Sequence, residues 1–173
     1  MRIIAGKWRG RRIDAPADDR VRPTGDRVRE AWMSIVKASL PGARVLDLFA
    51  GSGALGLEAL SRGAESIDIV EIAPKSLAAI SANADRLGAG GQITVHRADA
   101  LRFIERLEPH AYDVAFADPP YGMGLAERLA EQWLTKPFAD ILGVEHGGRE
   151  RLPGDGDTRG YGTAAITFFG LDA

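Results

Sequence analysis

From Arg44 onward the chain alternates short apolar runs with segments of helical periodicity, and this alternation limits its fold more than any other feature. The apolar runs predict strands, and the segments between them predict helices. The predicted strands span 45–48, 66–71, 92–96, 112–117, 140–145 and 164–169, and the predicted helices span 53–62, 74–87, 100–107 and 125–133. Such a repeat forms a mostly parallel sheet with right-handed crossovers, so we expect an α/β fold with helices on both faces.

The first 40 residues break this pattern. Short alternating segments on either side of residues 6–10 predict a small β-hairpin. A helix follows, with Thr24 or Asp26 as its predicted N-terminal cap. We therefore expect two units: a basic N-terminal extension of hairpin plus helix over 1–40, packed on a core domain over 41–173.

Composition excludes several classes of protein. The 173 residues suit one full core, and no apolar run approaches the ~20 residues that a membrane span needs. The chain has no cysteine, which excludes disulfides and thiolate zinc sites, and its three histidines are scattered, so no metal site is expected. No signal peptide is recognisable at the start, and the sequence predicts a cytoplasmic location without membrane contact.

The charge is unevenly distributed along the chain. Residues 1–30 hold nine Lys and Arg against five Asp and Glu, whereas the other 143 residues hold 13 against 19. A basic arm on an acidic body favours a polyanionic partner that the arm contacts.

A glycine-rich segment, residues 51–56, fits G-x-G-x-x-G between the first predicted strand and its helix. Glycines there allow a tight turn and close approach of a ligand to the backbone. Glu71 ends the next strand 20 residues later, where a carboxylate can accept two hydrogen bonds from ribose hydroxyls. The unit by itself fits NAD equally well. The alternatives are a plain strand–helix turn and a solvated Glu71.

Three acidic positions favour S-adenosylmethionine over NAD. Asp47 is placed to face an ammonium group, Asp99 to accept from an adenine amine, and Asp118 to lie where a methyl acceptor binds. Alternatively, Asp47 bonds loop amides and Asp99 caps a helix, a role that is compatible with binding. The candidate cofactor-binding residues are Asp47, Phe49, Ala50, Gly51, Ser52, Gly53, Glu71, Ile72, Asp99 and Ala100.

The candidate catalytic residues are Asp118, Pro119, Pro120 and Tyr121, which directly follow the fourth predicted strand. Two prolines cannot continue a sheet ladder, so the strand must end there. Ligands of open α/β sheets bind at this end of the strands. A carboxylate and a fixed carbonyl can hold an exocyclic amine, and the aromatic ring can stack on the heterocycle that carries it.

Residues 46–64, 2–6, 22–30 and 161–163 together closely resemble the RsmD-type bacterial small-subunit ribosomal RNA guanine-N2 methyltransferases. The resemblance spans essentially the whole chain, and its N-terminal segments are the most specific part. It implies a Rossmann-like, seven-stranded, S-adenosylmethionine-dependent methyltransferase with a small N-terminal extension. It also implies N2 methylation of a guanine in 16S-type rRNA within the assembled small subunit, by a monomer.

The extension supplies the candidate RNA-binding residues. These are Arg2, Lys7, Trp8, Arg9, Arg11, Arg12, Arg22, Thr24 and Arg27. The cations would meet phosphates and Trp8 would stack on a base or sugar. Alternatively, Trp8 packs the extension on the body, and Arg22, Thr24 and Arg27 organise the mouth of the active site.

Three other functions remain open on residue chemistry. The Asp-Pro-Pro-Tyr turn serves any exocyclic amine, so an adenine or cytosine amino-methyltransferase acting on other RNA or DNA is one alternative. A non-catalytic RNA-binding assembly factor on the same fold is another. An NAD-dependent dehydrogenase is the weakest, because no side-chain arrangement offers proton transfer beside a hydride site.

Overall fold

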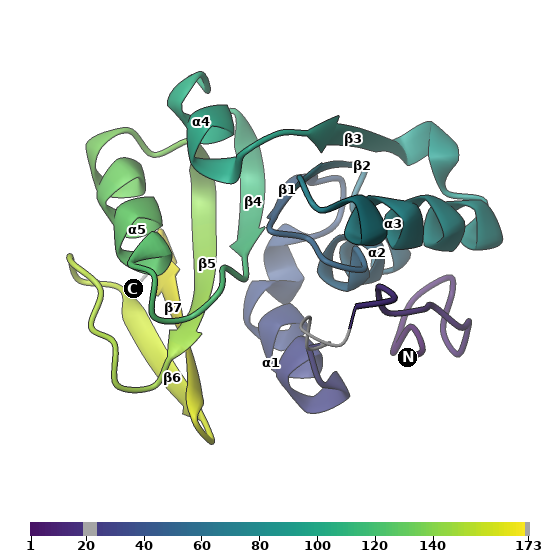
Figure 1. Cartoon of the computed structure of the whole chain (residues 1–173), viewed down its shortest axis with the longest axis horizontal. Coiled ribbons are helices and arrows are strands. Elements are labelled where there is room, and N and C mark those ends of the chain that lie inside the picture. Colours follow the sequence, from purple (N-terminus) through teal and green to yellow (C-terminus); the bar gives the residue numbers. More distant parts are fainter. Residues whose placement is uncertain (19–23, 172–173) are drawn as a thin grey trace.

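A seven-stranded sheet lies between two layers of helices in the computed structural model, which describes residues 1–18 and 24–171 (Figure 1). The strand order is β3-β2-β1-β4-β5-β7-β6. The strands are β1 (Arg44–Leu48), β2 (Ser66–Glu71), β3 (Ile93–Arg97), β4 (Tyr112–Ala117), β5 (Ala139–Gly147), β6 (Asp157–Tyr161) and β7 (Ala164–Phe169). The helices are α1 (Asp26–Val36), α2 (Ala54–Ser61), α3 (Pro74–Leu87), α4 (Ala100–Glu105) and α5 (Leu125–Thr135), with 3-10 turns η1 (Lys37–Ser39) and η2 (Gly90–Gln92).

The sheet is mixed but mostly parallel, which confirms the predicted α/β class. Strands β3, β2, β1, β4 and β5 run parallel to one another, and β7 is antiparallel to both β5 and β6. β1 lies at the centre of the parallel part, and its Val45, Leu46 and Leu48 are fully buried. Burial on both faces explains why this strand reads as an unbroken apolar run.

The helices divide into two layers with separate hydrophobic clusters. α1, α2 and α3 cover one face of the sheet, and α4 and α5 cover the other (Figure 1). Trp32 of α1 packs edge-on against Phe116 of β4 and Phe168 of β7, with ring centroids 5.4 and 5.6 Å away. No helix within the two described ranges is long and apolar enough to cross a membrane.

The predicted N-terminal β-hairpin is wrong. A single antiparallel bridge, between Arg2 and Arg12, replaces it. Backbone bonds join the two ends of the segment, as from Ile13 N–H to the Met1 carbonyl, but several donors between those ends bond to α2. Lys7 N–H donates to the Ser61 carbonyl over 2.9 Å, and Ile4 N–H donates to the Glu58 carboxylate over 2.9 Å. Because α2 takes these donors, a two-stranded ladder cannot extend.

Two further local predictions fail. Gly25 is the N-cap of α1 and no side chain caps the helix, so neither Thr24 nor Asp26 serves as predicted. β6 was not predicted, since it lies in a polar, glycine-rich stretch without apolar alternation. It is an exposed edge strand that pairs only with β7 among the described strands, and such strands carry little hydrophobic signal.

Candidate functional site

The candidate residues of the core converge where the parallel strands end. β1, β2, β4 and β5 present their carboxyl ends at one edge of the sheet because they run parallel in adjacent positions. The loops that follow these strands carry the predicted cofactor and catalytic residues. One edge therefore holds most of the predicted site, as expected for an open α/β sheet.

The loop between β1 and α2 has an unusual backbone. Phe49, Gly51 and Gly53 all have positive φ angles, of 56°, 59° and 79°. A non-glycine residue in this region carries strain of about 1–3 kcal/mol, and such strain clusters at ligand-binding sites. Gly56 allows α2 to approach the sheet, since a Cβ there would lie 3.0 Å from Asp47 Oδ2. The glycine motif thus forms the predicted tight turn between strand and helix, while its contact with a ligand stays a prediction.

Glu71 ties this loop to the end of β2. Its carboxylate accepts from Gly51 N–H over 2.9 Å, from Ile72 N–H over 2.7 Å and from Ala73 N–H over 2.9 Å. A carboxylate offers about four lone-pair sites, so about one remains for a ribose hydroxyl. The predicted contact with two hydroxyls is therefore limited to one strong bond. The same bonds hold the loop in place for a ligand.

Asp47 lies beneath the loop with 1% of its surface exposed. Its Oδ2 accepts from the Gly56 N–H over 3.0 Å, a structural backbone bond like that of the alternative, but to the first turn of α2 rather than to a loop. Burial raises the pKa of Asp47 to about 8, although the Gly56 bond opposes this and the Glu71 charge reinforces it. The contact with a ligand's ammonium group stays a prediction.

Asp99 caps α4, as the alternative held. Its carboxylate accepts from the Arg102 N–H over 3.0 Å. Ala100 is buried behind it, whereas Ile72 is one of the exposed large apolar side chains. The Asp99 side chain is exposed, so capping leaves an oxygen open to a ligand. Its predicted bond to an adenine amine is not tested.

Asp118 directly follows β4 and lies beside the start of α1. The Thr24 hydroxyl donates to Asp118 Oδ2 over 3.2 Å. This contact favours the alternative in which Thr24 organises the mouth of the site rather than binding RNA. Pro119 is buried, Pro120 is exposed and Tyr121 is 47% exposed. The aromatic ring is thus accessible for stacking.

Glu145 of β5 belongs to this cluster, and sequence analysis missed it. The Tyr121 hydroxyl donates to Glu145 Oε2 over 3.2 Å. Burial raises the pKa of Asp118 well above its usual range, and the hydrogen bond and charge of the neighbouring Glu145 raise it further. Burial and the same Glu145 charge also raise the pKa of Tyr121. Glu145 is the last residue of the predicted fifth strand, but it belongs to no sequence motif. Its position beside Asp118 is set by the register of β4 with β5.

Three predicted RNA-binding arginines of the N-terminal extension lie at the surface, whereas Arg29 is fully buried. Arg2, Arg9 and Arg27 line a hollow of about 410 Å³ between the N-terminal segment and α1, together with Asp26 and Glu30. The three arginines come from separate segments of the chain but lie around the same hollow, and we call them the cationic rim. α1 connects this rim to the Thr24–Asp118 contact described above.

The other predicted RNA-binding residues differ in role. Trp8 is only 9% exposed and packs in the main hydrophobic cluster, which is the packing role left open for it. Lys7 lies over the Trp8 ring and bonds Gln92. Arg11 and Arg12 are exposed, and their side chains contact the Arg86 carbonyl and the Asp14 carboxylate. Arg22 lies outside the described residues.

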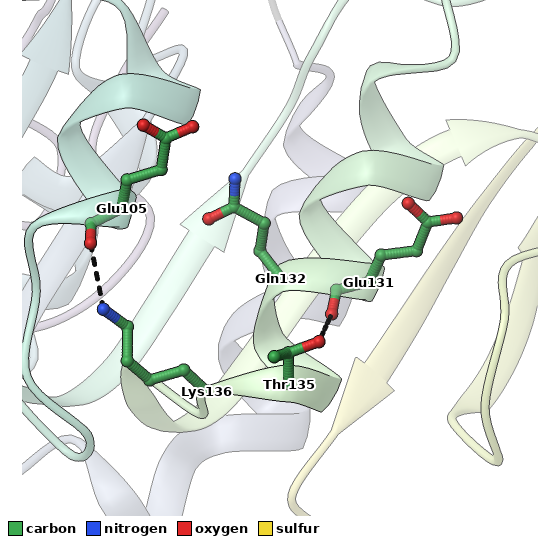
Figure 2. Close-up of a pocket in the computed structure, with 5 residues that line it drawn as sticks. All are labelled: Glu105, Glu131, Gln132, Thr135 and Lys136. Atoms are coloured by element: carbon green, nitrogen blue, oxygen red, sulfur yellow. Dashed lines mark hydrogen bonds between the residues drawn. The ribbon is translucent and has the colours of Figure 1, made fainter.

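A second hollow, of about 270 Å³, lies between α4 and α5 and is drawn in Figure 2. Its lining residues are polar in type, and two of them bond carbonyls of the helices: Lys136 Nζ donates to the Glu105 carbonyl and Thr135 Oγ1 to the Glu131 carbonyl. These residues stand at or just beyond the C-terminal ends of their helices, which return antiparallel to the strands. The hollow is therefore remote from the edge that carries the candidate site.

Comparisons with known proteins agree with this geometry. A family model described as conserved hypothetical protein 95 matches residues 1–155. Escherichia coli K12 ribosomal RNA small subunit methyltransferase D is 41% identical over 128 residues, or 73% of this chain and 63% of that protein. The aligned part thus spans less than two thirds of that relative's length. The Haemophilus influenzae protein of the same name is 38% identical over 148 residues, covering 82% of this chain and 76% of that protein.

A solved structure shares the fold over nearly the whole chain. It is described as a putative methyltransferase from Escherichia coli, with a TM-score of 0.82 and 32% identity. The match covers 97% of this chain and 96% of that one. The seven-stranded sheet and its two helical layers are therefore those of a methyltransferase fold.

Proposed function

The chain belongs to the conserved hypothetical protein 95 family, and on this premise we propose that it methylates the exocyclic N2 amine of a guanine in small-subunit rRNA, with S-adenosylmethionine as donor. One observation carries the proposal. An acidic strand end with an accessible tyrosine, Asp118 to Tyr121, lies one strand away from a strained glycine loop that Glu71 holds. Relatives that are 41% and 38% identical over their matched parts are named ribosomal RNA small subunit methyltransferase D.

The residues present fit this donor. Glu71 keeps about one lone pair for a ribose hydroxyl, and exposed Ile72 and Asp99 flank the place of an adenine ring. The glycine loop lets the backbone approach the ligand closely. When bound, the donor supplies an electrophilic methyl group on a positively charged sulfur.

Asp118 does the chemical work on the acceptor side. Guanine N2 is a poor nucleophile, because its lone pair is delocalised into the ring. Asp118 and the Pro119 carbonyl hold the amine so that the lone pair meets the methyl carbon. The new bond forms on N2, the carbon–sulfur electrons remain on sulfur, and N2 releases one proton. The raised pKa of Asp118 makes its carboxylate a better acceptor for that proton than an ordinary aspartate.

The base reaches Tyr121 only when it is unpaired or extruded, at a cost of a few kcal/mol. Stacking on the exposed ring is worth roughly 1–3 kcal/mol and offsets part of that cost. Residues 1–40 serve as the basic extension that holds the RNA, on a catalytic domain over 41–173. The rim of Arg2, Arg9 and Arg27 contacts phosphates. A ribosomal substrate implies a cytoplasmic enzyme, which we take to act as a monomer on the assembled small subunit.

RNA affinity tests the extension. The logarithm of the affinity falls with the logarithm of the salt concentration, and each phosphate that a cation neutralises adds roughly −0.7 to −0.9 to that slope. Replacing Arg2, Arg9 and Arg27 with glutamine removes contacts with up to about three phosphates, so the slope should become shallower by the contribution of those phosphates. Binding measured between low and moderate salt checks this. If the slope of the variant equals that of the wild type, the three arginines of the rim do not contact RNA phosphates.

The function itself is tested by methyl transfer from labelled S-adenosylmethionine to small subunits, to naked small-subunit rRNA and to DNA. We expect the label in N2-methylguanosine from RNA. Label in N6-methyladenosine or N4-methylcytidine, or label in DNA, supports the alternative amino-methyltransferases. No transfer to any of the three, with RNA still bound, supports a non-catalytic assembly factor.

A further inference from the structure

Glu145 is a buried carboxylate placed beside the reacting group. It is 8% exposed and lies on β5 directly after Val144, which pairs with Ala117 of β4. Glu145 and Asp118 therefore continue two adjacent parallel strands in the same register. Nothing in the proposed methyl transfer requires a second carboxylate at this point.

The groups around Glu145 define what it can bind. Tyr121 donates its hydroxyl to Glu145 Oε2, and Thr24 donates its hydroxyl to Asp118 Oδ2. The carboxyl groups of Asp118 and Glu145 are hydrogen-bonded neighbours. Two close carboxyl groups form a hydrogen bond only by sharing one proton. A ligand that presents two donors side by side can replace that proton and satisfy both carboxylates.

Only one of the candidate bases presents such an edge. Guanine carries N1–H next to its N2 amine, so two neighbouring donors face the site. Adenine and cytosine place an unprotonated ring nitrogen, an acceptor, next to their exocyclic amine. An ionised carboxylate accepts only, so opposite that ring nitrogen it would meet a lone pair.

We infer that Glu145 is the residue that selects guanine: its carboxylate accepts from guanine N1–H while Asp118 accepts from the N2 amine. This inference rests on the proposed function and deepens it. On binding, the proton shared by the two carboxyl groups leaves for solvent. After methyl transfer, the proton lost by N2 returns to the pair. The amine is thus held at two points of the base, which fixes its lone pair toward the donor.

The test changes the hydrogen-bonding group on each side of the proposed contact, first at N1 of the base and then at residue Glu145. The methylated guanine is first mapped with the wild type, and RNA is then prepared with 2,6-diaminopurine at that position. This base keeps the 2-amine but has an acceptor at N1. The wild-type kcat/KM should fall roughly tenfold to a hundredfold on this RNA, because Glu145 loses its donor and meets a lone pair.

Glu145→Gln should reverse part of this preference. Glutamine has both an acceptor and a donor, and it can turn its amide N–H toward N1 of diaminopurine. We expect kcat/KM for guanine RNA to fall by roughly tenfold or more, and the guanine-to-diaminopurine ratio to shrink by at least about tenfold. Affinity for S-adenosylmethionine, measured by calorimetry, should stay within about threefold and shows that the variant is folded.

Two variants complete the design. Glu131→Gln makes the same chemical change in the remote hollow between α4 and α5, and should match the wild type on both RNAs. Tyr121→Phe removes the hydroxyl bonded to Glu145 and should slow both reactions while keeping the ratio. A ratio that is unchanged in Glu145→Gln overturns the assignment of Glu145 and leaves the proposed function standing. A wild type that methylates no guanine RNA overturns both.

Discussion

The two halves of the site use the same type of side chain in opposite ways. On the β1–β2 side, Asp47 accepts from the backbone N–H of Gly56 in the first turn of α2, and Glu71 accepts from backbone N–H groups of two loops. On the β4–β5 side, Asp118 and Glu145 lie against each other and receive side-chain hydroxyls, from Thr24 and Tyr121. Backbone amides fix a loop for binding, whereas carboxylates crowded together gain basicity. This contrast fits the proposed roles, in which the first half holds the donor and the second accepts protons.

The largest expected effect is on the β4–β5 side. Asp118→Asn keeps the shape of the side chain but removes its ability to take the N2 proton, so kcat should fall roughly 10²–10⁴-fold. Affinity for S-adenosylmethionine should change little, because the proposed function places the donor at the β1–β2 half. Single-turnover kinetics and calorimetry check both. A mutant with wild-type kcat would remove Asp118 from the chemistry.

Asp47→Asn tests whether burial of Asp47, on the β1–β2 side, makes the free energy of unfolding depend on pH. The pKa of Asp47 is about 8 in the folded chain against 3.8 for the free group, so folding favours the protonated form. The stability that this proton contributes is complete below about pH 4 and is lost as pH rises through about 8. At about 1.36 kcal/mol per unit of pKa, the loss amounts to a few kcal/mol.

Asparagine at position 47 does not ionise, so the variant should not lose this stability as pH rises, and its side chain can still accept from Gly56 N–H. Chemical denaturation of both proteins without ligand, at about pH 5 and about pH 9, measures the difference in their free energies of unfolding. Comparing the two proteins cancels the opposite contributions of groups with lowered pKa, such as Glu30. Parallel pH profiles would mean that Asp47 is ionised in the folded protein.

Glu71→Gln should weaken donor binding without slowing the chemical step. The glutamine N–H₂ must face at least one of the backbone N–H groups that Glu71 accepts from, which loosens the loop at Gly51. We expect the Kd for S-adenosylmethionine to rise roughly tenfold to a hundredfold, with kcat at saturation nearly unchanged. Glu65→Gln, an exposed site near the other end of β2, is the matched control. A fall in kcat at saturating donor would mean that Glu71 also affects the chemical step, which contradicts the division of roles between the two halves.

The smallest effect is expected from Tyr121→Phe. The ring that stacks on the base remains, and only the hydroxyl bonded to Glu145 is removed. One hydrogen bond of about 1 kcal/mol corresponds to a severalfold change, so kcat/KM for RNA should fall roughly threefold to tenfold. Steady-state kinetics on small subunits measures it. A loss as large as that of Asp118→Asn would mean that the hydroxyl itself takes part in proton transfer.

Sequence reasoning located the β1–β2 side well because its signals are local. The glycines of 51–56 and Glu71 stand at strand ends that apolar runs already define, and the structure joins them through the Gly51–Glu71 hydrogen bond. It was wrong about the N-terminal hairpin, since the donors of that segment bond to Glu58 and Ser61, which lie more than 50 residues away. Alternation within the segment carries no information about such partners.

The sequence by itself determined the alternation of strands and helices over the core except for β6, the glycine turn and the acidic strand end at Asp118. These signals are readable because proline, glycine and apolar periodicity act within a few residues. The tertiary structure alone decided that Glu145 meets Asp118 and that Thr24 bonds the same carboxylate. Those contacts depend on strand order, on the register of β4 with β5 and on where α1 begins relative to the sheet. Pairing across 27 and 94 residues is set by packing of the whole core, which no short motif encodes.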